Sequence, residues 1–167
     1  MQVLIYHSDQ CDSKKCTGAR LIRQEIVRGV RDIGRLKHTV FLNPYERIPL
    51  SIADRPAALK MGVGLIDASW AHAMTQHQNF KAKVPRRLPH LIPVNPMNYG
   101  KVSLLTSAEA IAGALFILGE EEEARRVLNA IQWGPHFEEL NRDLIELYKS
   151  AKNPEEILKI ERDVIFL

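Results

Sequence analysis

Short apolar runs rich in β-branched residues mark the first half of the chain. Three of them, residues 3–6 (VLIY), 40–42 (VFL) and 63–66 (VGLI), predict β-strands, and residues 91–94 (LIPV) predict a fourth. The first two runs are separated by an amphipathic stretch that is long enough for a crossover helix. The pattern therefore predicts an α/β fold with a parallel sheet.

The amphipathic stretch between the first two runs has helical spacing. Its apolar side chains recur every three or four residues, at Ala19, Ile22, Ile26, Val30 and Ile33. We therefore expect one helix in this interval. Its other face carries arginines, at Arg20, Arg28, Arg31 and Arg35, with Arg23 at the flank.

From residue 105 onward the chain has the periodicity of successive helices. Thr106 and Glu109 have the spacing of a capping box, so the first of these helices is expected to begin near Thr106. The Pro-rich residues 85–96 resist regular helix. We expect an α/β domain at residues 1–94 and a mainly helical domain at residues 95–167. Breaks between the helices are predicted at Gly119, Gly134 and Asn153-Pro154.

Composition and charge narrow the class of protein. The chain has 167 residues, its longest strongly apolar run (residues 110–118) is too short to span a bilayer, and no basic region precedes the apolar N-terminal residues. We expect a cytoplasmic protein with no membrane partner. Residues 1–118 contain 16 Lys and Arg against 8 Asp and Glu, whereas residues 119–167 contain 7 against 12. The basic part could bind a polyanion, although composition alone favours this no more than a basic solvated surface.

Two features suggest chemistry without specifying it. Cys11 and Cys16 lie close to His7, but no second pair of ligands follows, so we expect no metal site. Asp67 and Trp70 follow an apolar strand, at the end of a parallel sheet where ligands bind. The commoner alternative is that Asp67 caps the next helix and Trp70 packs in the core.

Several longer motifs occur in one order along nearly the whole chain. They are DSKKCTGARL (12–21), FLNP (41–44), LSIADRP (50–56), GLIDASWA (64–71), RRLPHLIPVNPMNYGK (86–101), LLTSAEAIAGALFILG (104–119) and WGPHFEELN (133–141). Together they resemble the S-adenosylmethionine-dependent aminocarboxypropyltransferases of small-subunit ribosomal RNA. The resemblance implies a monomer with a SPOUT-like fold, in which an N-terminal parallel sheet with flanking helices is joined to a mainly helical C-terminal part. It also implies a deep trefoil knot.

The resemblance also implies which residues hold S-adenosylmethionine. Thr17 and Ser107 would lie near its amino acid moiety, Ile66 at its ribose, and Leu88 and Ser103 at its adenine. The apolar walls would come from Leu42, Pro44 and Trp70. A mostly apolar cleft with a few polar groups is the usual form of such a site.

The implied reaction depends on which carbon of the sulfonium faces the nucleophile. Trp70 and Ala73 would bury the methyl group, so the aminocarboxypropyl group would be transferred and methylthioadenosine released. The implied acceptor is N3 of a uridine-derived base, whose proton calls for a general base, and Asp67 is the candidate. Alternatively, Asp67 only stabilises the sulfonium.

The expected RNA partner would be bound by side chains from the basic part of the chain. The candidates are Lys14, Lys15, Arg20, Arg23, Arg28, Arg31, Lys60, Arg86, Arg87 and Lys101. Three rival functions stay open. They are a SPOUT-type rRNA methyltransferase, a non-catalytic ribosome-assembly factor, and an RNA-binding protein without a cofactor.

Overall fold

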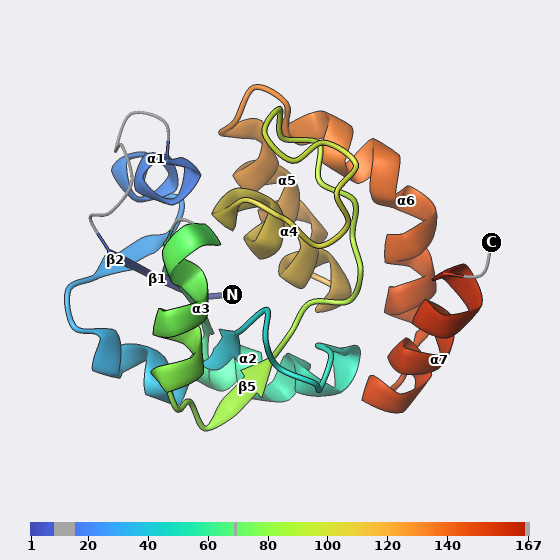
Figure 1. Cartoon of the computed structure of the whole chain (residues 1–167), viewed down its shortest axis with the longest axis horizontal. Coiled ribbons are helices and arrows are strands. Elements are labelled where there is room, and N and C mark those ends of the chain that lie inside the picture. The colour runs from blue at the N-terminus through green and yellow to red at the C-terminus, as the bar shows by residue number, and fades with distance from the viewer. Residues whose placement is uncertain (9–15, 69, 166–167) are drawn as a thin grey trace.

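Within the residues that this computed structural model describes (1–8, 16–68 and 70–165, without the side chains of 70–73 and 165), five parallel strands form the centre of the fold. From one edge to the other they are β2 (Arg28–Val30), β1 (Val3–His7), β4 (Val63–Asp67), β3 (Val40–Leu42) and β5 (Val84–Arg86). The prediction of an α/β fold with a parallel sheet is confirmed (Figure 1). β1 and β4 pair along their whole length, which brings His7 and Asp67 side by side.

The interval between β1 and β3 is not one helix, so that prediction was wrong. Helix α1 (Thr17–Arg23) ends early, Glu25 takes a left-handed conformation at φ 54°, and β2 and the 3-10 helix η1 (Ile33–His38) follow. The short strand β2 obtains its backbone hydrogen bonds from β1, and this long-range pairing overrides the local spacing. The predicted arginine face is therefore divided among several elements.

Residues 91–94 do not form a strand, which is a second correction. They have no regular secondary structure. Among the described residues the remaining strand is instead β5, which we did not predict. The reason is visible at Ile92. Its backbone N–H donates to Asn141 Oδ1 at 2.7 Å, and its carbonyl accepts from Asn141 Nδ2 at 2.8 Å. The Asn141 side chain thus forms the two backbone hydrogen bonds that a neighbouring strand would otherwise form with Ile92.

Alternate strand residues face two separate apolar layers. Val3 and Ile5 of β1 belong to the larger layer, together with residues of α1, α2 (Arg55–Met61, after the 3-10 turn η2 at Ile52–Asp54) and the C-terminal helices. Leu4 belongs to the smaller layer, with η1 and Phe80 after α3 (Trp70–Asn79). Both faces of the sheet are therefore covered, as buried parallel sheets require.

Four helices follow the capping box at Thr106 and Glu109, which the structure confirms. They are α4 (Ser107–Ile117), α5 (Glu121–Asn129), α6 (Gly134–Ser150) and α7 (Pro154–Ile165). The breaks predicted at Gly119 and Asn153-Pro154 are confirmed, and Gly119 has φ 79°. Gly134 is instead the first residue of α6. No helix among the described residues is long and apolar enough to cross a membrane.

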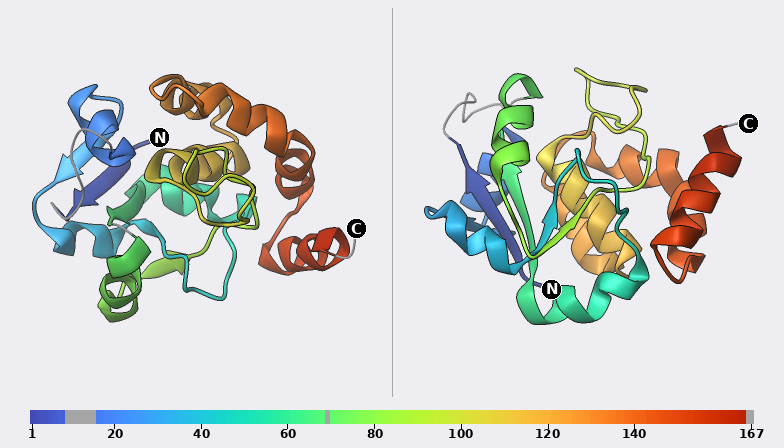
Figure 2. Two further views of the ribbon diagram at one scale, coloured as in Figure 1. Left: turned by 45° about the horizontal axis from the view of Figure 1, so that its top comes forward. Right: turned by 60° about the horizontal axis from the view of Figure 1, so that its bottom comes forward.

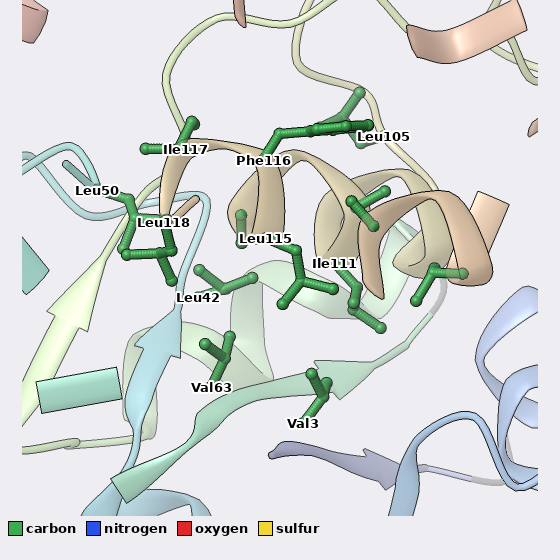
Figure 3. Close-up of a cluster of buried hydrophobic side chains, with 14 of the residues drawn as sticks. Val3, Leu42, Leu50, Val63, Leu105, Ile111, Leu115, Phe116, Ile117 and Leu118 are labelled. Atoms are coloured by element: carbon green, nitrogen blue, oxygen red, sulfur yellow. The ribbon is translucent and has the colours of Figure 1, made fainter. Parts of the chain in front are cut away.

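Helix α4 is the centre of the larger apolar layer. Ile111 and Leu115 point from it toward Val3 and Val63 of the sheet (Figure 3). On its other side, a Cβ at Gly113 would lie 2.6 Å from Leu91, so the glycine lets the segment after β5 approach closely. The sheet and this segment are thereby packed against the same helix.

Candidate functional site

A cavity of about 590 Å³ lies at the carboxyl ends of β3 and β4. The sheet contributes Leu42, Leu65 and Ile66, and the starts of α1 and α4 also line it. The remaining wall comes from the segment after β5, whose loop projects beyond the carboxyl ends of the strands (Figure 2, right). Parallel sheets bind their ligands at this edge.

The fold brings most of the predicted site residues to this cavity. Those that line it are Thr17, Leu42, Pro44, Ile66, Asp67, Leu88, Ser103 and Ser107. They come from separate parts of the chain and meet only in the folded protein. The other two predicted residues, Trp70 and Ala73, have side chains that lie outside the described residues.

Asp67 is the last residue of β4, and it is 5% exposed. Its Oδ1 accepts a hydrogen bond from Ser107 Oγ at 2.5 Å, and its Oδ2 accepts one from Cys16 Sγ at 2.7 Å. His7 Nε2 lies 3.8 Å from Oδ2. A buried carboxylate needs such donors, and these direct it toward the starts of α1 and α4.

Gly18 lets α1 approach this carboxylate. A Cβ at Gly18 would lie 2.5 Å from Asp67 Cγ and would overlap the nearer carboxylate oxygen. Any larger residue would therefore displace the Asp67 side chain from its position.

Hydroxyl groups cap the start of α4 beside Asp67, and one of them comes from the start of α1. Thr17 Oγ1 accepts a hydrogen bond from the backbone N–H of Ala108 at 3.3 Å, and Thr106 Oγ1 accepts one from Glu109 at 3.3 Å. The first amides of a helix have no partner within the helix. These hydroxyls satisfy two of them and orient the first turn of α4 at the cavity.

One wall of the cavity, residues 87–106, has almost no regular secondary structure and is held by side chains of the C-terminal helices. Glu109 in α4 is fully buried and accepts four hydrogen bonds from this segment. Its Oε1 accepts from the backbone N–H groups of Val94 (2.8 Å) and Asn95 (2.9 Å). Its Oε2 accepts from Asn95 Nδ2 and from the N–H of Thr106, both at 2.8 Å. The carboxylate thus ties together the two ends of the loop between them.

Helices α6 and α7 hold the rest of this wall. Glu161 in α7 is buried, accepts two hydrogen bonds from Arg87 at 2.8 and 2.6 Å, and accepts a third from the N–H of His90 at 3.0 Å. The Tyr148 hydroxyl in α6 donates to the His90 carbonyl at 3.1 Å. Burial raises the pKa of Tyr148, and the charge of Glu161 raises it further, so this hydroxyl keeps its proton.

Ser103 lies on the same wall in a left-handed conformation, with φ 67°. Its N–H donates to the Leu91 carbonyl at 2.9 Å, and its Oγ lies 2.9 Å from His90 Nδ1. Left-handed backbone at a residue other than glycine is unfavourable and persists where the surroundings impose it. The contacts with Leu91 and His90 impose it here.

Several lining residues were not predicted. They are Cys16, Asn43, Leu65, Ala68, His77, Pro89, His90, Asn95, Met97, Asn98, Leu105, Thr106 and Ala110. The Asn- and Pro-rich residues 95–100 were a usable signal for the loop, because such turns offer backbone donors and acceptors. No local signal marks His77, which lies at the end of α3 and is buried by the fold.

Three potential metal ligands lie close together among the described residues. They are side-chain atoms of His7, Cys16 and Asp67, and these atoms lie within 4.8 Å of one another. Our sequence reasoning paired Cys16 with Cys11, which lies outside the described residues. Two of the three groups, Cys16 and Asp67, are already joined by a hydrogen bond. The absence of a metal site stays a prediction.

The predicted RNA-binding cations differ in their surroundings. Arg86 pairs with Asp54 at 3.0 Å, and Arg87 pairs with Glu161 at 2.6 Å and lines the cavity. Arg20 is partly exposed, and the exposed members are Arg23, Arg28, Arg31, Lys60 and Lys101. Lys14 and Lys15 lie outside the described residues.

Known proteins resemble this chain over nearly its whole length. The family described as "Ribosome biogenesis protein, C-terminal" matches residues 40–165, and the one described as "Possible Fer4-like domain in RNase L inhibitor, RLI" matches residues 1–32. A 16S rRNA aminocarboxypropyltransferase from Methanosphaera stadtmanae is 38% identical, covering 99% of this chain and 98% of the relative. One from Sulfurisphaera tokodaii is 42% identical, covering 98% and 93%.

A solved structure supports the same assignment. It is described as the SAM-dependent rRNA:acp-transferase from Vulcanisaeta distributa, and it matches with a TM-score of 0.87 and 32% identity, covering 99% of this chain and 98% of that one. The order of motifs, the fold and these relatives agree with one another. The chain therefore belongs to the 16S rRNA aminocarboxypropyltransferase family.

Proposed function

We propose that this protein transfers the 3-amino-3-carboxypropyl group of S-adenosylmethionine to N3 of a uridine-derived base in small-subunit rRNA, during ribosome biogenesis. The observation that carries the proposal is the cavity at the carboxyl ends of β3 and β4, in which the buried Asp67 stands among mostly apolar walls. Its volume suits a nucleoside-sized ligand. Relatives that match nearly the whole chain are named 16S rRNA aminocarboxypropyltransferase.

The lining residues suggest how the cofactor lies. Thr17 and Ser107, at the joined starts of α1 and α4, would hold the amino acid moiety, and Ile66 would contact the ribose. Leu88 and Ser103 on the opposite wall would enclose the adenine. Further apolar contacts would come from Leu42, Pro44, Trp70 and Ala73.

The orientation of the sulfonium decides which group is transferred. With the methyl group turned toward Trp70 and Ala73, the methylene of the aminocarboxypropyl arm faces the RNA. N3 of the base forms a bond to this methylene carbon, and the bond between that carbon and sulfur breaks. The electron pair remains on sulfur, and neutral methylthioadenosine leaves.

Asp67 is our candidate for the general base that takes the N3 proton. The alternative, stabilisation of the sulfonium by its charge, predicts a different response to Asp67→Asn. Loss of a base lowers the turnover rate, by about 10²- to 10⁴-fold for a typical proton transfer, and leaves the affinity for S-adenosylmethionine nearly unchanged. Loss of a stabilising charge also weakens cofactor binding.

The identity of the nucleoside by-product tests the proposal. We expect that incubation with small-subunit RNA from cells that lack this protein yields methylthioadenosine, detected by mass spectrometry. Formation of S-adenosylhomocysteine instead would make the protein a methyltransferase. RNA binding with neither by-product would make it a non-catalytic assembly factor, and failure to bind S-adenosylmethionine in calorimetry would leave an RNA-binding protein without a cofactor.

The proposal extends to the organisation of the chain. We propose a SPOUT-like trefoil knot, which the family resemblance implies. The loop after β3 and the segment after β5 lie side by side at a parallel bridge between Pro49 and Arg87. We also propose an α/β domain at residues 1–94 and a helical domain at residues 95–167 that completes the cofactor site. Because one apolar layer contains residues of both domains, they should unfold together.

We propose a cytoplasmic monomer that binds no metal and no membrane.

The proposed RNA contacts follow the exposure of the cations. The exposed Arg23, Arg28, Arg31, Lys60 and Lys101 are the strongest candidates for phosphate contacts, together with Arg20. Arg86 and Arg87 would contact RNA only through the part of each side chain that its ion pair leaves accessible. Lys14 and Lys15 complete the proposed set.

A further inference from the structure

Two loops at the mouth of the cavity expose large apolar side chains. The loop after β3 carries Tyr45, which is 40% exposed and follows the lining residue Pro44. The loop after β5 carries Met97 (83% exposed) and Tyr99 (67% exposed), on either side of the lining residue Asn98. Large apolar side chains grouped beside a cavity are a common feature of binding surfaces.

Both loops place an exposed cation two residues after the tyrosine. Arg47 follows Tyr45, and Lys101 follows Tyr99. Single-stranded nucleic acid is bound by this combination, in which aromatic rings stack on bases and cations contact phosphates. A protein partner would not require the same pairing of ring and cation on two separate loops beside one cavity.

The two tyrosines are presented by ordered turns. The N–H of Tyr45 donates to Asn43 Oδ1 at 3.0 Å. The centroid of the Tyr45 ring lies 6.1 Å from that of the buried His77 ring. Tyr99 is flanked by two backbone bonds, from the N–H of Asn98 to the Asn95 carbonyl (3.2 Å) and from the N–H of Gly100 to the Pro93 carbonyl (3.1 Å). Because these contacts order the backbone of both loops, little further backbone entropy is lost when a base stacks on the tyrosines.

We propose that Tyr45 and Tyr99 form a stacking rim for the unpaired nucleotides that flank the reacting base, with Arg47 and Lys101 contacting their phosphates. This inference rests on the proposed function, because a base that reaches the cavity must carry its neighbours across these loops. Unstacked bases of an RNA loop expose the rings that such a rim binds. The net positive charge of residues 1–118 is compatible with the same partner.

The test measures binding of a fluorescein-labelled RNA hairpin with a uridine loop, alongside the same stem as an uninterrupted duplex. Tyr45→Ala and Tyr99→Ala should each weaken hairpin binding about 5- to 150-fold, the range for loss of one base stack. The Tyr→Phe variants should stay within about twofold of the wild type, because they keep the ring. Arg47→Ala and Lys101→Ala should each reduce the salt dependence of log K by about 0.7, the value for one phosphate of a single strand.

Leu59→Ala is the matched control, since Leu59 is 56% exposed on α2 and does not line the cavity. It should bind the hairpin as the wild type does, and thermal unfolding should show that each variant is folded. Wild-type affinity in both Tyr→Ala variants would overturn the proposal and leave a protein partner for these loops. Equal losses on hairpin and duplex would also overturn it, because stacking requires unpaired bases.

The test separates this inference from the proposed function. If methylthioadenosine forms but the tyrosine variants bind the hairpin normally, the stacking rim is wrong and the transferase activity stands. If no methylthioadenosine forms but hairpin binding depends on both rings, the transferase activity is wrong and the rim stands.

Discussion

Substitution of Glu109 by glutamine tests whether α4 holds the wall of the cavity. The carboxylate accepts four hydrogen bonds from N–H groups, two on each oxygen. Glutamine has nearly the same shape, but its amide nitrogen would face two N–H donors, so two hydrogen bonds would be lost. At about 1.5–3 kcal/mol for each hydrogen bond to a charged group, we expect the free energy of unfolding to fall by about 3–6 kcal/mol.

Urea unfolding measures this change, and calorimetric titration with S-adenosylmethionine measures its effect on the site. Cofactor binding should weaken, because Ser103 and Asn98 lie on the segment that Glu109 ties down. Glu146→Gln is the control, since that side chain is 66% exposed and should change stability by no more than about 0.5 kcal/mol. A loss below about 1 kcal/mol for Glu109→Gln would refute the reasoning, because it is less than a single such bond contributes.

Three further changes probe the neighbouring contacts. Gly18→Ala should displace the Asp67 carboxylate and lower the rate of transfer about 100-fold or more, and a normal initial rate would contradict this. Glu161→Gln should destabilise the protein by about 3–5 kcal/mol in urea unfolding because Arg87 loses its buried partner, and unchanged stability would show that the pair does not hold α7 to the wall. The pKa of Tyr148 is raised in the folded protein. The free energy of unfolding therefore keeps its full value below pH 10.0, the ordinary pKa of tyrosine, and falls as the pH rises above it, because there only the unfolded state ionises. Tyr148→Phe should lose about 1 kcal/mol at neutral pH. Unfolding measured across the alkaline range should show a weaker pH dependence in this variant than in the wild type.

The strands at the centre of the sheet could be predicted, whereas those at its edges could not. The apolar runs of β1 and β4 are continuous and buried on both faces, which gives them a strong local signal. β2 and β5 have three residues each and depend on backbone pairing with neighbours far away in the sequence. The spacing of Ile22, Ile26 and Val30 therefore resembled one helix, although these residues lie in and around α1 and β2.

The site shows the same division between local and long-range information. Asp67 ends a buried strand, but that position alone fitted a helix cap at least as well, and the family resemblance was needed to identify it as the candidate base. The start of α4 could be predicted from its capping box. The capping box gave no indication that Glu109 also binds the N–H groups of Val94 and Asn95, because that contact depends on the packing of the wall against α4. The same holds for Glu161, which reaches the cavity wall from the last helix.

Transfer of label from S-adenosylmethionine into RNA tests the central claim most directly. Two parallel reactions would use small-subunit RNA from cells that lack this protein, one with cofactor labelled in the methyl group and one with cofactor labelled in the carboxyl carbon. We predict that label enters the RNA only from the carboxyl carbon, because in the proposed orientation Trp70 and Ala73 bury the methyl group and leave the aminocarboxypropyl arm facing the base. Label entering only from the methyl group would contradict the account.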